Sequence, residues 1–112
     1  MNNLLVWIKY SFVVAGSFLT SLLGGWDTAL KVLVIFVIMD QIAGMTAAYL
    51  CKSLDSRVGF KGIFRKILLF VPIAMGYLLD TLLGEELLRN LAIYFYIANE
   101  GLSMVENLGR AG

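Results

Sequence analysis

The sequence predicts an all-α integral membrane protein with four transmembrane helices, or with three and a fourth that lies at the membrane interface. Of its 112 residues, 60% are apolar and only 15% are charged, whereas soluble domains carry about 25% charged residues. A soluble chain this short would have difficulty burying so much hydrocarbon around one core. Four apolar stretches occupy most of the chain, separated by turns rich in glycine or charge.

We expect a single domain, 1–112, with helices over residues 4–23, 29–50, 63–83 and 87–108 paired as helical hairpins. A hydrocarbon core of about 30 Å needs about 20 helical residues per crossing, and the first two stretches reach that length. The first is predicted to be a retained helix rather than a secretory signal. Its only base, Lys9, lies inside the apolar run, and no small-x-small cleavage site follows.

The third and fourth stretches are less regular. Residues 63–83 are near the short limit for a crossing, and Pro72 is expected to kink the helix in its middle. In residues 87–108 the longest uninterrupted apolar run is 91–98. This segment either spans the membrane or lies along its surface, and the charge pattern of the loops favours four crossings.

The basic residues predict the orientation, because lysine and arginine collect on the cytoplasmic side of bacterial membrane proteins. Loop 51–62 and its edges hold five of the nine bases, namely Lys52, Arg57, Lys61, Arg65 and Lys66. The other two turns carry Asp27 and the pair Glu85 and Glu86. With four crossings, this loop and both termini are expected in the cytoplasm.

Several classes of function are excluded or disfavoured by composition. The chain has no histidine and one cysteine, Cys51, which excludes an internal disulfide, a Cys/His zinc site and catalysis by imidazole. Nine bases nearly cancel eight acids, so no strong charge attracts nucleic acid. No nucleophile has a recognisable base beside it. We therefore expect no enzyme, no cofactor, no metal and no nucleic-acid partner.

Polar residues inside the apolar stretches are the candidate functional residues. Asp40 lies in the middle of the second stretch, where an acid costs about 2.5–3.5 kcal/mol on insertion scales. It shares a helix face with Gly44 and Ala48, a small-xxx-small pair that admits a neighbouring helix. The fourth stretch carries a polar face of its own, which includes Asn99, Glu100, Ser103, Glu106 and Asn107.

Two interpretations of these polar faces stay open. In the first, they pack against one another inside one four-helix bundle, with the acids protonated or paired to Lys9 or Arg89. In the second, they pack between subunits and can line a water-filled lumen, because carboxylates inside membranes tend to mark cavities and pathways. The two arrangements could also be successive states of one protein.

The order of several motifs resembles the toxin-secretion and phage-lysis holin family, over roughly residues 24–108. The matching stretches are Gly25-Trp26-Asp27, Leu30-Lys31-Val32-Leu33, Asp40 with Gly44, Ser56 through Gly59-Phe60-Lys61-Gly62 to Lys66, and Phe95-Tyr96-Ile97-Ala98-Asn99-Glu100-Gly101 with Ser103 and Glu106-Asn107. Such holins usually continue into a polar, charged tail. This sequence stops at Gly112 and departs from the family's pattern at this point.

This resemblance implies a small protein that forms homo-oligomers in the bacterial inner membrane and opens lesions at a set time. The implied partners are further copies of the chain, membrane lipids, and a cargo endolysin or large toxin that leaves through the lesion. A small four-helix multidrug or ion transporter is the main alternative, although such exporters rely on an acid in the first helix, where this chain has Lys9. A non-conducting membrane scaffold is the third candidate function.

Overall fold

A computed structural model describes residues 2–52 and 56–112, with side chains described up to Lys52 and again from Gly59. The described residues form α1 (Asn2–Leu22), α2 (Thr28–Leu50), α3 (Ser56–Ile67), α4 (Phe70–Leu83) and α5 (Leu88–Ala111), without a strand. Three described stretches are long and apolar enough to cross a membrane, Asn2–Leu22, Thr28–Leu50 and Gly59–Leu83. The predicted all-α membrane fold is confirmed.

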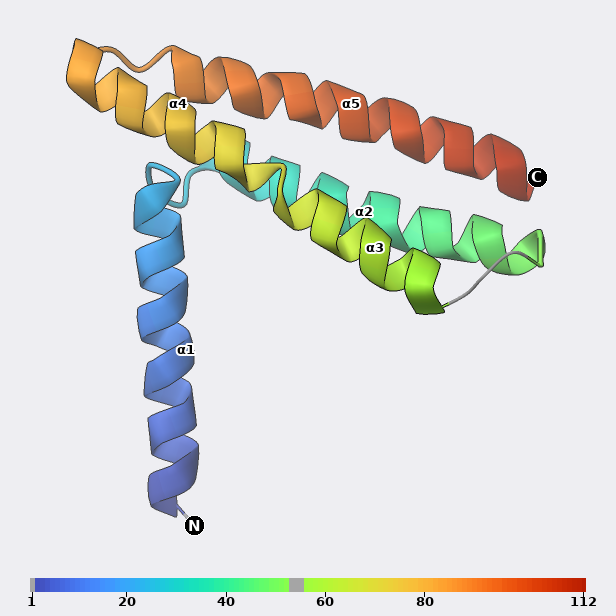
Figure 1. The fold of residues 1–112 in the computed structure, drawn as a ribbon, viewed down its shortest axis with the longest axis horizontal. Coiled ribbons are helices and arrows are strands. Elements are labelled where there is room, and N and C mark those ends of the chain that lie inside the picture. Colours follow the sequence, from blue (N-terminus) through green and yellow to red (C-terminus); the bar gives the residue numbers. More distant parts are fainter. Residues whose placement is uncertain (1, 53–55) are drawn as a thin grey trace.

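Helices α2, α4 and α5 form the packed part of the molecule (Figure 1). The core consists of Leu30 and Leu33 from α2, Ile73 from α4 and Ile93 from α5, all fully buried. Helix α5 runs parallel to α2 along its length, because Ile93 packs with Leu30 near one end and the Cys51 Sγ lies 3.7 Å from the Arg110 carbonyl oxygen at the other. This core fixes the register of the polar residues that follow along both helices.

Helix α1 extends away from the packed helices at a steep angle (Figure 1). None of its residues is buried, and among the described helices it contacts only α4. Its exposed side chains are mostly large and apolar, such as Trp7, Phe12 and Phe18. The surface of α1 therefore suits lipid or another protein rather than water.

The third predicted segment consists of two helices, because α3 ends at Ile67 and α4 begins at Phe70. Pro72 has no N–H to donate to the carbonyl of Leu68, four residues earlier, and that carbonyl accepts from the Val71 N–H at 3.2 Å instead. The kink predicted from Pro72 is confirmed. Helix α3 starts at Ser56, so most of the expected loop 51–62 is helical.

Two short turns join the spans at the other end of the molecule. Gly24 and Gly25 have φ values of 89° and 102°, which glycine adopts without the steric cost that other residues meet. Asp27 then caps α2, because its Oδ1 accepts from the Leu30 N–H at 3.0 Å. Helix α4 ends at Leu83 and is capped by Gly84 in the left-handed conformation, and α5 starts at Leu88.

Candidate functional site

A cluster of three charged side chains lies between α2, α3 and α5. The Lys66 Nζ on α3 is 2.5 Å from the Asp40 Oδ2 on α2 and 2.8 Å from the Glu100 Oε2 on α5. Asp40 is 2% exposed and Glu100 4% exposed. One ammonium group thus joins two buried carboxylates from two different helices.

The cluster is also hydrogen-bonded beyond its ion pairs. The Asn107 Nδ2 on α5 donates to the Asp40 Oδ1 at 3.1 Å, so both carboxylate oxygens of Asp40 have partners. Two acids share one base, and the cluster therefore carries an excess negative charge when all three groups are ionised. Cavities of about 440 Å³ and 420 Å³ border Asp40 and Lys66, which gives the cluster adjoining space for water.

The position of Lys66 corrects two of the sequence-based expectations. The sequence places Lys66 at the edge of the basic loop, whereas the structure places it against Asp40 and Glu100. The acids were expected to pair with Lys9 or Arg89 if they packed within one protomer. Instead Arg89 pairs with Asp27, and Lys9 lies exposed on α1. Helix α3 begins early and packs against Gln41, which carries Lys66 to the level of Asp40.

The structure brings together most of the predicted polar residues. Gly44 faces Asn107, because a Cβ on Gly44 would lie 3.3 Å from the Asn107 Nδ2. Ala48 is buried in α2, and Ser103 lines both cavities beside Asp40. Asn99 and Glu106 also line the 420 Å³ cavity, but both side chains are exposed on the surface of the protomer.

The remaining basic residues stay near the α2–α3 connection. Lys52, Lys61 and Arg65 are exposed, as a loop or interfacial position requires. Arg57 belongs to α3, but its side chain lies outside the described part of the chain. Among the described residues, no group of histidine, cysteine or acidic side chains could hold a metal ion.

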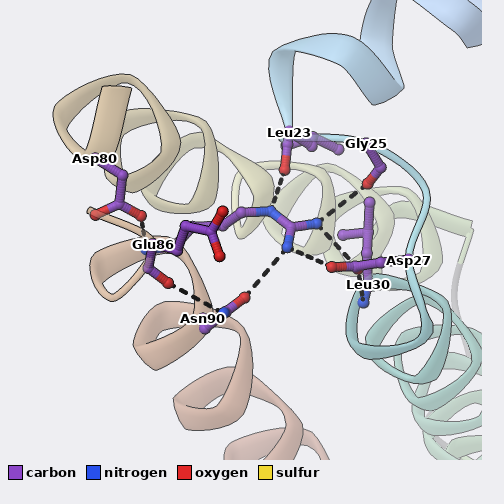
Figure 2. Close-up of polar contacts among 8 residues, drawn as sticks. Leu23, Gly25, Asp27, Leu30, Asp80, Glu86 and Asn90 are labelled. Atoms are coloured by element: carbon purple, nitrogen blue, oxygen red, sulfur yellow. Dashed lines mark hydrogen bonds and ion pairs between the residues drawn. The ribbon is translucent and has the colours of Figure 1, made fainter. Parts of the chain in front are cut away.

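A second polar site, which the sequence did not reveal, is centred on Arg89 of α5. Its guanidinium group donates to the carbonyl oxygens of Leu23 and Gly25, and to both oxygens of Asp27 at 2.7 and 3.0 Å. Figure 2 shows these groups of the α1–α2 turn converging on one point. Arg89 is 6% exposed. It therefore links the α1–α2 turn to the start of α5.

Asp80 and Gly76 of α4 hold the same end of α5. The Asp80 carboxylate accepts from the backbone N–H groups of Leu88 and Arg89, both at 2.9 Å, which satisfies donors that a helix start leaves free. A Cβ on Gly76 would lie 3.0 Å from the Arg89 backbone nitrogen, so the two helices approach closely there. The sequence shows Gly76 and Asp80 on one side of the segment, but it does not show their partners.

Charge attraction affects the acidity of Asp27, which lies outside the spans. The hydrogen bond from Arg89 is the main cause that holds the pKa of Asp27 below its ordinary value of 3.8, and the Leu30 N–H acts in the same direction. Desolvation opposes both. The Asp27 side chain is 50% exposed, so water screens part of this interaction.

Comparisons with known proteins identify the family. A family model described as the bacteriophage holin family matches residues 17–112. The chain belongs to this family. Holins are non-enzymatic membrane proteins, and membership therefore confirms both the resemblance drawn from the motifs and the expectation that the chain is not an enzyme.

Three relatives show the range of similar proteins. An uncharacterised 14.9 kDa protein from the nagH 3′ region of Clostridium perfringens is 37% identical over all of this chain and 86% of its own length. An uncharacterised protein of Listeria monocytogenes is 37% identical over 94% of this chain and 76% of its own. A protein of Bacillus phage phi105 named "Probable holin" is 37% identical over 74% of this chain and 62% of its own. No solved structure matches the holin-family chain.

Proposed function

We propose that this chain acts as a holin, which accumulates in the bacterial cytoplasmic membrane and assembles with copies of itself into lesions. These lesions release an endolysin or a large toxin. Membership of the holin family and the named phage relative support this role. The main observation behind the mechanism is the Asp40–Lys66–Glu100 cluster. Its charged side chains lie buried between helices that expose many large apolar side chains.

The cluster supports a two-stage mechanism. In the free protomer or an early oligomer, Lys66 forms ion pairs with both buried acids, which lowers the cost of holding them in lipid. In the lesion, the polar side of α5 faces water. Asn99 and Glu106 support this step, because they are exposed on the protomer although they lie on a helix that packs along a membrane span. Neighbouring subunits shelter both residues before the lesion opens.

Three of the four proposed crossings, α2, α3–α4 and α5, fit the arrangement of the helices. Helix α5 has 24 residues, or about 36 Å of helix, and it lies parallel to the apolar span α2 along its length. If α2 crosses the membrane, α5 crosses beside it. The basic α2–α3 connection and both termini then lie in the cytoplasm. Helix α1 extends at a steep angle to these three spans (Figure 1). The fourth crossing therefore requires α1 to reorient at Gly24 and Gly25 and to pack on the helices of neighbouring subunits.

Inducible expression in bacteria tests the proposal. Membrane potential is followed together with release of two cytosolic fluorescent proteins of different size. Abrupt depolarisation with protein release is expected, and the size cutoff reports the lesion width. Depolarisation with both proteins retained would contradict the proposal and indicate a small pore or transporter, and an unchanged potential would indicate a scaffold. An I93R variant, which disrupts the core, controls for the burden of expression.

A further inference from the structure

The 440 Å³ cavity extends beyond the ion-pair cluster and lies between α3 and α5. Residues from α2, α3 and α5 line it, and α3 makes no close backbone contact with α5 among the described residues. Gly44, Gly59 and Gly62 border the cavity, and their lack of side chains keeps it open. Arg65 from α3 and Arg110 from α5 line it from two sides.

These two arginines lack acidic partners within the described part of the protomer. None of the three ion pairs found there includes Arg65 or Arg110. Among the described residues, the Arg110 guanidinium donates only to the Asn107 Oδ1, at 3.4 Å. Asp40, the acid that lines the same cavity, is occupied by Lys66 and Asn107. Glu106 lines the neighbouring cavity with Arg65 but forms no ion pair with it. The cavity therefore presents two guanidinium groups that form no ion pair with a described carboxylate.

We propose that this cavity binds the headgroup of an anionic phospholipid, with Arg65 and Arg110 holding its phosphate. Guanidinium groups match the geometry of phosphate oxygens, and basic pockets between transmembrane helices bind anionic headgroups. Arg110 lies in the last turn of α5, and the exposed apolar side chain of Met45 on α2 lines the cavity. The phosphate of the lipid thus has two arginine partners, and the acyl chains of the lipid have an apolar side chain next to them.

A bound lipid would join α3 to α5 where the protein itself leaves a gap. This site concerns the resting protomer and does not depend on lesion formation. A failure of the lipid-site proposal can therefore be distinguished from a failure of the proposed holin role, because lipid binding is measured on purified protein without any lysis.

Native mass spectrometry of the full chain in detergent tests the site, with phosphatidylglycerol and phosphatidylcholine of matched chain length in competition. Wild type should retain phosphatidylglycerol at least tenfold more strongly. R65Q/R110Q should lose this preference, and R65K/R110K should keep part of it, because lysine retains the charge but not the planar fork. K9Q/K31Q is the matched control, since it removes two charges from exposed positions that do not line the cavity.

Three results would overturn the proposal. The first is equal retention of the two lipids by wild type, and the second is an unchanged preference in a folded R65Q/R110Q or R65K/R110K variant. The third is an equal loss in K9Q/K31Q, which would show general charge attraction. A parallel experiment adds inorganic phosphate at the lipid concentration. Displacement of phosphatidylglycerol would assign the cavity to free phosphate and would reject the lipid, whereas continued retention supports it.

Discussion

Arg89 and Asp27, which are 62 residues apart in the chain, form a two-pronged contact in which the guanidinium nitrogens lie 2.7 and 3.0 Å from the two carboxylate oxygens. This contact joins the start of α2 to the start of α5. Because α2 and α5 are parallel, fixing their first turns also fixes which residues of the two helices meet farther along. The register that brings Asp40 beside Glu100 thus begins at the Arg89–Asp27 contact.

The Asp27 contact should make stability depend on pH in the acid range. The folded-state pKa of Asp27 is lowered, so this carboxylate stabilises the fold above its unfolded pKa of about 3.9. The contribution is lost as the pH falls through the lower, folded-state pKa. In detergent, wild type should unfold at a higher temperature than D27N at pH 6, and this difference in unfolding temperature should shrink below about pH 4. A difference that stays constant down to pH 2.5 would contradict this role.

Gly76 should tolerate no side chain, because α4 meets the backbone of α5 there. A Cβ at this position would lie 3.0 and 3.1 Å from backbone atoms of Arg89, so G76A should lose about 1–3 kcal/mol of stability through overpacking. The matched control is G16A in α1, where no atom lies within 4 Å of the new Cβ. That change should gain about 0.5–1 kcal/mol from helix propensity. Equal effects in denaturation experiments would refute the close approach.

Lys66 should be essential for folding because it is the shared ion-pair partner of two buried acids. K66Q leaves Asp40 and Glu100 together without a cation, and such a loss costs about 3–5 kcal/mol. The triple variant K66Q/D40N/E100Q removes all three charges and should recover most of that stability. Thermal unfolding of the purified proteins in detergent measures both the loss of stability in K66Q and its recovery in the triple variant. The ion-pair cluster has no structural role if K66Q unfolds at the wild-type temperature.

Asp40 should influence the timing or the size of the lesion. D40N retains the shape of the side chain but removes a charge that Lys66 and Asn107 hold in the protomer. The balance between the packed and the open state should therefore shift. Time-lapse recording of depolarisation in induced cells, with the size cutoff for released proteins, measures the change. E85Q is a suitable control, because it removes an exposed acid outside the cluster. Unchanged timing, cutoff and oligomer distribution in D40N would reject a role for Asp40.

The sequence allowed the helical spans to be predicted, because an apolar stretch of sufficient length is a local property. The polar residues on α2 and α5 could also be named, since their spacing places them on single faces. The partner of those acids could not be predicted in the same way. Lys66 reaches Asp40 because α3 packs on α2, and the first part of α3 is a polar stretch that the sequence predicts as a loop.

One signal in the sequence could have revealed the position of Lys66. Gly59, Gly62 and Lys66 are three and four residues apart, so they share a face if this region is helical. A Cβ on Gly62 would lie 3.2 Å from the Gln41 Oε1, which shows that this face packs on α2. Arg89 offered no such signal, because its partners lie in a turn 62 to 66 residues away, and that proximity depends on the packing of the whole bundle.

The central claim is that the polar side of α5 faces water once the lesion opens. The most direct measurement is labelling of N99C, in a C51A background, by a membrane-impermeant maleimide before and after depolarisation of induced cells. N99C should be labelled only after depolarisation. V105C, on the apolar side of the same helix, should stay unlabelled at both times. N99C that remains unreactive after depolarisation, or N99C and V105C that react equally, would contradict the central claim.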